Sequence, residues 1–196
     1  MPPMTTIHFV RHGEVYNPDK ILYGRLPGFR LSTAGESQAA AAGMHLSTRP
    51  LAAVISSPQL RARQTAEHIA RPHGLTVEVS ALVDEVHSPY EGRPAAELDA
   101  QGWLLYTNVL PGYETPADIM ARVLRQIDLL RARYPADEVA VVTHGDIVLA
   151  VQFWAQGIPF TDETKNSVAV YPATASITSM HFNGHARPQF TYHRPY

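Results

Sequence analysis

The sequence predicts an α/β fold, a three-layer α/β/α sandwich with a mostly parallel central sheet. Short apolar runs typical of strands alternate along the chain with longer segments that carry helix-start signals and helical periodicity. The chain has 196 residues, of which 45% are hydrophobic and 17% charged, as in an ordinary globular domain with a sizeable core. Because the sequence shows no internal repeat, linker or low-complexity tract, we expect residues 1–196 to form a single domain.

Composition and charge exclude several classes of function. The formal net charge is -2, so the chain has no strongly basic field that would hold a nucleic-acid backbone. There is no cysteine, which excludes disulfides and cysteine-based catalysis. The first residues lead straight into a strand-like run without the basic start and apolar stretch of a signal peptide. No apolar run approaches the roughly 20 residues that span a bilayer. We therefore expect a cytoplasmic protein without a nucleic-acid or membrane partner; the oligomeric state is not predicted.

The N-terminal elements begin with a β-rich run over Thr5–Val10, which we expect to be the first strand. Residues 17–30 are rich in proline and glycine and are predicted to form a long loop. Thr33 and Glu36 have the spacing of a capping box, and an alanine-rich stretch follows them to about residue 46. This combination predicts a helix.

The next segments continue the alternation. Residues 52–56 form a second apolar run that ends shortly before Pro58, and this proline suits the first turn of a helix that continues to Ile69. Residues 75–79 are a third strand candidate, and residues 84–94 are rich in turn formers. The order strand, helix, strand favours a parallel pairing of the strands.

The second half of the chain repeats the same pattern. We expect a helix over about residues 94–106, and a further helix that begins at Thr115 with Asp118 in its first turn. Apolar residues recur at helical spacing along that second helix. The remaining predicted elements are a very apolar strand over 138–143, a helix over 146–156, and strands with turns over 167–192.

Polar residues stand at the ends of three of the predicted strands. The first strand delivers Arg11 and His12. The second delivers Ser56, Ser57 and, one helical turn later, Arg61. The last delivers His144. Ligands of open α/β sheets bind outside the carboxyl ends of the strands. These side chains, far apart in sequence, are therefore expected to meet in one crevice.

Two imidazoles and two guanidiniums in one crevice predict a dianionic ligand, because a guanidinium matches phosphate oxygens bidentately. A neutral imidazole can attack phosphorus and form a phosphoramidate that water later cleaves. The departing alkoxide needs a proton, which a carboxylic acid can supply. Asp84 and Glu85, in the loop after the third predicted strand, are the nearest carboxyl groups.

Four segments, in order, carry a family resemblance over residues 5–150. They are Arg11-His12-Gly13-Glu14, resembling an RHG signature; Leu31-Ser32-Thr33-Ala34-Gly35-Glu36-Ser37-Gln38-Ala39, resembling L-(S/T)-x-x-G-x-x-Q-A; Ser56-Ser57-Pro58-Gln59-Leu60-Arg61-Ala62-Arg63-Gln64-Thr65-Ala66, resembling SSPxxRxxQTA; and Thr143-His144-Gly145. Together they resemble the histidine phosphatase superfamily, which includes the cofactor-dependent phosphoglycerate mutases. The resemblance implies a phosphoglycerate mutase-like fold, with residues 1–196 as a single histidine phosphatase domain.

The resemblance implies roles for individual positions. His12 matches the nucleophile, and Arg11, Arg61 and His144 match the phosphate pocket. Asn17 matches a further substrate-binding position, although the family places its asparagine four residues after the glutamate and here the gap is three. Alternatively, Asn17 serves only as a turn residue before Pro18.

Two carboxyl groups compete for the role of general acid. An ungapped match of residues 82–92 to the family pattern places Asp84 at the acid position, and a one-residue shift places Glu85 there. We favour Glu85, because the longer side chain is the usual choice in the family. Five aromatic residues either line a substrate pocket or pack in the core: Tyr16, Tyr23, Tyr90, Trp103 and Tyr106.

These observations predict a metal-independent phosphatase, without a cofactor, that hydrolyses a small phosphomonoester through a phosphohistidine on His12. One alternative is a mutase, which returns the phosphoryl group to substrate and must shield the phosphohistidine from water. The region between Glu85 and Thr115 shows no large insertion that would close the pocket, which favours the hydrolase. Another alternative is a phosphate-binding module that has lost catalysis. The presence of His12, Arg61 and His144 argues against this alternative.

Overall fold

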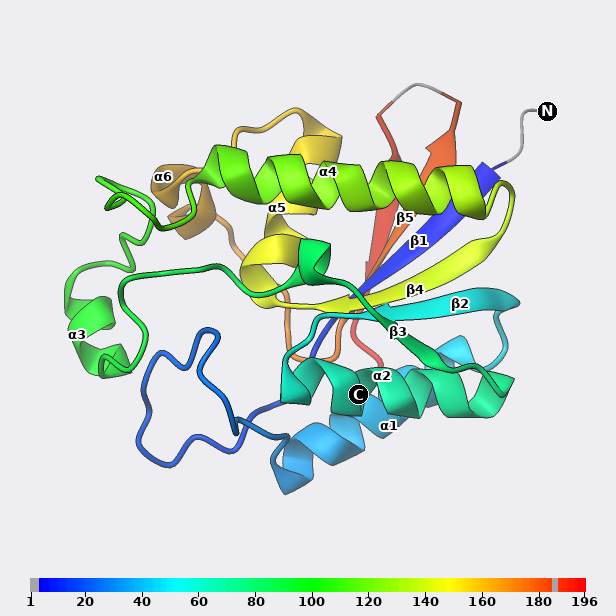
Figure 1. The fold of residues 1–196 in the computed structure, drawn as a ribbon, viewed down its shortest axis with the longest axis horizontal. Coiled ribbons are helices and arrows are strands. Elements are labelled where there is room, and N and C mark those ends of the chain that lie inside the picture. Colours follow the sequence, from blue (N-terminus) through cyan, green and yellow to red (C-terminus); the bar gives the residue numbers. More distant parts are fainter. Residues whose placement is uncertain (1–3, 185–186) are drawn as a thin grey trace.

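A computed structural model describes residues 4–184 and 187–196, and in this part of the chain six strands form one sheet in the order β3-β2-β4-β1-β5-β6 (Figure 1). The four strands from β3 to β1 run parallel, whereas β5 and β6 are antiparallel to their neighbours. The mostly parallel sheet predicted from the sequence is therefore confirmed. The strands are β1 (Met4–Arg11), β2 (Leu51–Ser56), β3 (Val77–Val79), β4 (Glu138–Thr143), β5 (Ile177–Asn183) and β6 (Gln189–His193).

Helices cover both faces of the sheet, which gives the predicted three layers (Figure 1). On one face lie α1 (Thr33–Leu46) and α2 (Leu60–Ala70), which pack on Val10, Val54 and Val142 of the sheet. On the other face lie α4 (Pro116–Arg133) and α5 (Gly145–Gln156), which pack on the alternate strand residues, such as Phe9 and Val141. The central strands β1, β2 and β4 are mainly apolar because both of their faces are buried. The short elements are η1 (Arg71–His73), η2 (Ala81–Val83), α3 (Ala95–Ala100) and α6 (Asp162–Asn166).

The helix starts follow local capping chemistry, with two corrections to the sequence prediction. The N-cap of α1 is Ser32, whose Oγ accepts a hydrogen bond from the Gly35 N–H at 3.0 Å. The capping box predicted at Thr33 was therefore wrong, because the cap lies one residue earlier and Gly35 has no side chain to complete a box. α2 begins at Leu60, after Pro58 instead of with it. The capping box at the start of α4 joins Thr115 and Asp118, as their positions suggested.

The helix expected over residues 94–106 is the largest departure from the sequence prediction, because α3 ends at Ala100. Trp103 has a positive φ of 53°, which a right-handed helix does not allow. Beyond it the N–H groups of Leu105 and Tyr106 donate to the carboxylate of Asp162, both at 2.9 Å. A distant side chain therefore replaces the helical hydrogen bonds of this segment.

Two smaller boundaries also differ from the prediction. β3 covers only Val77–Val79 of the expected 75–79. In the tail predicted as strands over 167–192, residues 167–176 form turns and irregular backbone, and the strands begin with β5 at Ile177.

The strand register aligns the strand ends that carry the predicted site. Arg11 pairs with Thr143 across β1 and β4, and Ser56 pairs with Val142 across β2 and β4. The residues that follow these pairs, His12, Ser57 and His144, therefore leave the sheet at the same edge.

Two glycines let the turn after β1 pack directly on the first turn of α1. An added Cβ at Gly13 would lie 2.5 Å from the Gly35 carbonyl oxygen, and one at Gly35 would lie 2.0 Å from the Glu14 carbonyl oxygen. The Gly13 N–H also donates to Thr65 Oγ1 at 3.0 Å. The backbone next to His12 is thus held by α1 and α2 together.

Replacing Gly35 with alanine is expected to destabilise the fold by about 1–3 kcal/mol, because the methyl group meets a backbone carbonyl that cannot rotate away. Chemical denaturation measures the change in the free energy of unfolding. Ser37→Ala, at an exposed position of the same helix, serves as the control and should change that free energy by less than about 0.5 kcal/mol. Equal stability of the Gly35→Ala variant and the native protein would contradict the close approach.

Candidate active site

His12 follows β1 directly and is buried, with 2% of its surface exposed. Its backbone is fixed on both sides, because its N–H donates to the Thr143 carbonyl at 2.9 Å and its carbonyl accepts from the Ala175 N–H at 3.1 Å. The ring Nδ1 lies 2.7 Å from the Gly13 carbonyl oxygen. A carbonyl only accepts, so Nδ1 carries the proton and Nε2 is left with a lone pair that can accept a hydrogen bond.

Arg61 lies at the centre of the site although it belongs to the first turn of α2 and is only 1% exposed. Its Nε donates to His12 Nε2 at 3.2 Å. Its Nη2 donates to the Gly24 carbonyl at 2.8 Å and also lies 3.3 Å from Glu85 Oε2 and 3.2 Å from His144 Nδ1. One guanidinium therefore touches the three other groups of the site.

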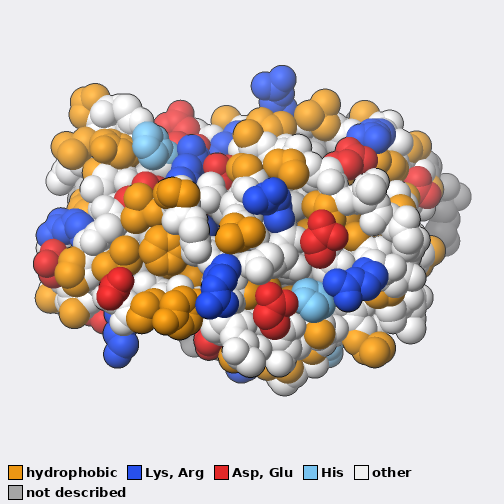
Figure 2. Space-filling model, turned by 60° about the horizontal axis from the view of Figure 1, so that its bottom comes forward, with side chains coloured by type: hydrophobic (Ala, Val, Ile, Leu, Met, Phe, Trp, Pro, Cys, Tyr) orange, Lys and Arg blue, Asp and Glu red, His pale blue; other side chains and the backbone are white. Residues whose placement is uncertain are grey.

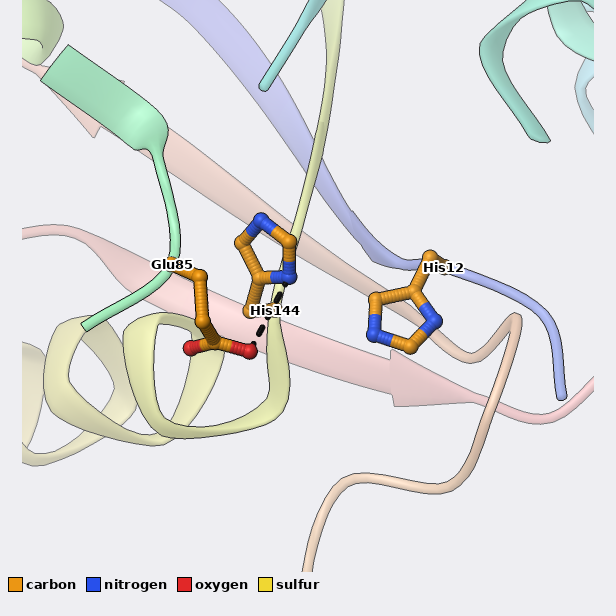
Figure 3. Close-up of side chains that lie close together, drawn as sticks. All are labelled: His12, Glu85 and His144. Carbon is orange, nitrogen blue, oxygen red and sulfur yellow. Dashed lines mark ion pairs between the residues drawn. The ribbon is translucent and has the colours of Figure 1, made fainter. Parts of the chain in front are cut away.

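Glu85 and His144 complete the buried cluster (Figure 3). Glu85 comes from the loop after η2, His144 precedes α5, and Glu85 Oε2 lies 3.2 Å from His144 Nδ1. The rings of His12 and His144 lie with their centroids 5.2 Å apart. Four side chains from four segments thus surround one small space.

Asp84 occupies a different place from Glu85. Its carboxylate accepts hydrogen bonds from Ser57 Oγ at 3.0 Å, from Gln59 Nε2 at 2.9 Å and from the Glu85 N–H at 2.7 Å. Ser57 Oγ in turn lies 2.7 Å from His144 Nε2. Asp84 therefore stands behind His144, one hydroxyl removed from it. Sequence reasoning placed Ser57 at a strand end but did not find this link, for which the only signal was its place after the second strand.

Arg11 approaches the same space from the end of β1. Its Nη1 donates to the Pro172 carbonyl at 2.7 Å, and its guanidinium carbon lies 5.2 Å from the centre of the Tyr171 ring. Its Nε is buried and has no hydrogen-bond partner among the residues that the structure describes. A donor without a partner beside this cluster suits an anionic ligand.

Asn17 lines the same cavity, but its side chain already has partners. Nδ2 donates to the Ile21 carbonyl at 2.9 Å, and Oδ1 accepts from the Ile21 N–H at 3.3 Å. The side chain therefore closes a turn in the 17–30 loop, which is the alternative that the sequence left open. Its contact with a substrate stays a prediction.

The electrostatics of the cluster set the charge of its members. Burial lowers the pKa of His12 well below its ordinary value, and the charges of Arg61, His144 and Arg11 lower it further. Burial also lowers the pKa of His144, despite the neighbouring Glu85 carboxylate. Burial raises the pKa of Glu85, but the facing His144 and Arg61 outweigh it and hold that pKa below its usual range. At neutral pH the free protein thus combines a neutral His12 with an ionised Glu85.

The cluster opens into a cavity of about 550 Å³ whose lining includes Arg11, His12 and Glu85. Of the five candidate aromatic residues, Tyr23, Trp103 and Tyr106 line this cavity, whereas Tyr16 and Tyr90 are absent from its described lining. Hydrophobic side chains gather on the left of the face drawn in Figure 2, toward the end of the molecule where Figure 1 places α3.

A sequence profile described as histidine phosphatase superfamily (branch 1) matches residues 7–192, nearly the whole chain. The chain belongs to the histidine phosphatase superfamily. This membership confirms the resemblance seen in the four motif segments.

Individual relatives agree with the superfamily. An uncharacterized protein of Mycobacterium tuberculosis is 37% identical over 202 residues, covering 100% of this chain and 98% of the relative. An uncharacterized phosphatase, PhoE of Bacillus subtilis, is 28% identical over 150 residues, covering 76% of each chain. The native structure of a mycobacterial glucosyl-3-phosphoglycerate phosphatase has a TM-score of 0.80 and 25% identity, covering 97% of this chain and 99% of that one. The last two of these proteins are named as phosphatases.

The structure brings the predicted residues His12, Arg61, Glu85 and His144 into one cluster, with Arg11 and Asn17 beside it. It separates Asp84 from the cavity. Within the described residues, no helix is long and apolar enough to cross a membrane.

The His12 ring is expected to stay neutral, with the proton on Nδ1, at pH 6.5, because burial and the neighbouring cations lower its pKa below that ordinary value. Long-range ¹H–¹⁵N spectra of labelled protein measure this, with His12→Asn to assign the signal. Arg11→Gln removes one of the cations and should move the titration of His12 to higher pH. A His12 ring that carries its proton on Nε2 at pH 7 would contradict the assignment.

Proposed function

We propose that the protein is a phosphatase that hydrolyses a small phosphomonoester through a phosphohistidine on His12. The observation that carries this proposal is the short contact of 2.7 Å between His12 Nδ1 and the Gly13 carbonyl oxygen, which assigns the proton to Nδ1 and leaves the Nε2 lone pair facing Arg61. A neutral, oriented imidazole beside fixed cations is what nucleophilic attack on phosphorus requires.

In the first step His12 Nε2 attacks phosphorus, the P–N bond forms and the P–O bond to the alcohol breaks. Protonated Glu85 gives its proton to the departing oxygen, so the alcohol leaves neutral. Arg11, Arg61 and His144 donate hydrogen bonds to the remaining phosphoryl oxygens and stabilise their charge. In this role Arg61 exchanges its bonds within the cluster for bonds to the phosphate.

In the second step the Glu85 carboxylate accepts a proton from a water molecule, which attacks phosphorus. The P–O bond to water forms, the P–N bond breaks, and His12 returns to its starting state with inorganic phosphate as the product. The acid of the first step is therefore the base of the second.

The protonation of Glu85 depends on the substrate. In the free protein His144 and Arg61 hold the pKa of Glu85 down. A bound phosphate dianion places negative charge next to the carboxylate and engages both partners, which raises the pKa of Glu85. The substrate thus creates the proton donor that its own cleavage needs. Asp84 is the poorer candidate, because three hydrogen-bond donors hold its carboxylate on the far side of Ser57.

We also propose that the reaction needs no metal. Ligand atoms of His12, Glu85 and His144 lie within 4.8 Å of one another, a grouping that could hold a metal ion. However, the Arg61 guanidinium reaches atoms of all three residues at 3.2–3.3 Å. A permanent positive charge at the centre of this trio repels a cation and favours an anion.

Hydrolysis is preferred to a mutase reaction for two reasons. First, two of the similar proteins, PhoE and the mycobacterial glucosyl-3-phosphoglycerate phosphatase, are named as phosphatases. In addition, α3 and the irregular segment after it account for most of the region between Glu85 and Thr115, which contains no large closing insertion. The orientation of His12 favours an active enzyme over a silent phosphate-binding module.

Replacing His12 with asparagine should lower kcat on aryl phosphates by a factor of about 10⁴ or more, because the nucleophile is lost. Rapid quenching in alkali, followed by mass spectrometry, should find one added phosphoryl group in the native protein and none in the variant. His45→Asn, an exposed position on α1, is the control and should retain activity. All assays contain EDTA, which should leave the rate unchanged. A fully active His12→Asn variant would remove the nucleophile assignment.

Glu85→Gln and Asp84→Asn are expected to differ in their dependence on the leaving group. Loss of a general acid costs about 10²–10⁴ in rate for alkyl esters, whose alkoxides need protonation, and far less for p-nitrophenyl phosphate. Glu85→Gln should show this contrast, whereas Asp84→Asn should slow both esters alike through His144. The measurement is kcat/KM for both esters. The opposite pattern would assign the acid to Asp84.

A further inference from the structure

The cavity extends beyond the proposed phosphate pocket into a region with a different character. There its wall consists mainly of apolar and aromatic side chains from the 17–30 loop, the segments around α3 and the chain after α6. The residues that define this apolar wall are Ile21, Leu22, Val86, Trp103, Leu105 and Val168. The alcohol part of a phosphomonoester held at His12 would lie against this apolar wall.

One ion pair interrupts the apolar wall. Lys165 Nζ lies 3.3 Å from Asp146 Oδ2, and the two side chains are only 8% and 10% exposed. The Asp146 carboxylate also accepts hydrogen bonds from the hydroxyls of Tyr106 and Tyr171, both at 2.5 Å. The Asp146 carboxylate therefore has three partners, the Lys165 ammonium group and the two tyrosine hydroxyls. The ion pair holds Lys165 at the wall of the cavity.

The charge of Lys165 is already compensated. Among the described residues that line the cavity, Arg11 and Lys165 are the only lysine or arginine side chains, and Arg11 belongs to the phosphate pocket. An anionic group on the substrate would have to draw Lys165 away from Asp146 and leave a buried carboxylate unpaired, which is costly. The Tyr106 ring, 5.2 Å from Lys165 Nζ, further favours the present position of the ammonium group.

We propose that the apolar wall and the Asp146–Lys165 pair select phosphomonoesters whose alcohol is uncharged and mainly apolar, and disfavour those with a second phosphate or a carboxylate. This inference rests on the proposed phosphatase function. An apolar ring gains free energy by burial against Trp103 and Leu105. A carboxylate in the same place loses its hydration, gains no free cation and faces Asp146.

Two esters of matched shape test the selection directly. 4-Carbamoylphenyl phosphate carries a neutral amide at the ring position where 4-carboxyphenyl phosphate carries a carboxylate. We expect kcat/KM of the native protein to favour the amide by about tenfold or more, because of the uncompensated charge. A ratio near one, or a preference for the carboxylate, overturns the inference.

Two variants should move this ratio in opposite directions. Asp146→Asn keeps hydrogen-bonding groups for the tyrosines but frees the charge of Lys165, so the preference for the amide should fall by about tenfold. Lys165→Gln leaves Asp146 uncompensated, so the preference should rise. Because each value is a ratio within one protein, a general loss of activity cancels. A ratio that stays unchanged in Asp146→Asn overturns the role of the pair.

The outcomes separate this inference from the proposed function. If the native protein hydrolyses neither ester and forms no phosphohistidine, the proposed function fails, and the inference fails with it. If the phosphohistidine forms and the carboxylate ester is preferred, the phosphatase function stands and only the substrate class is overturned.

Discussion

The structure of the site depends on one buried guanidinium. Arg61 is 1% exposed and permanently charged, so its burial is tolerated only because acceptors surround it. The Gly24 carbonyl, His12 and Glu85 supply these acceptors from three separate segments, and His144 lies against the same guanidinium. The guanidinium at the start of α2 therefore ties together the long 17–30 loop, the loop after η2 and the two histidines.

The groups that pair with the Arg61 guanidinium can be replaced by a bound anion. In the free protein the ionised Glu85 balances the charge of Arg61 beside a neutral His12, and a bound dianion would take over the contacts of the guanidinium. The fixed carbonyl contacts of His12 keep its Nε2 oriented in both states. Catalytic groups that need no reorganisation contribute most to stabilising a transition state.

The sequence was sufficient to predict the fold and the site where a strand pattern ends directly in a residue with catalytic chemistry. Apolar runs ending in His12 and His144 predicted both the parallel strands and the residues that meet at their ends. Sequence could not separate Asp84 from Glu85, because the distinction comes from Ser57, a residue that the pairing of β2 and β3 brings next to this loop. The end of α3 was missed for the same reason: Asp162, 56 positions beyond Tyr106, supplies the hydrogen bonds. Local propensity carries no information about such partners.

The start of α5 links the phosphate pocket to the apolar wall. His144 and Asp146 stand two residues apart there, the first facing Glu85 and the second held by Tyr171. The ring of Tyr171 also lies against the Arg11 guanidinium. Arg11 Nη1 donates a hydrogen bond to the carbonyl of Pro172, the residue after Tyr171. Any group that displaces Asp146 therefore also disturbs Tyr171 and, through it, the guanidinium proposed to hold the phosphate. Selection of the alcohol and orientation of the phosphoryl group are, on this geometry, two consequences of one set of contacts.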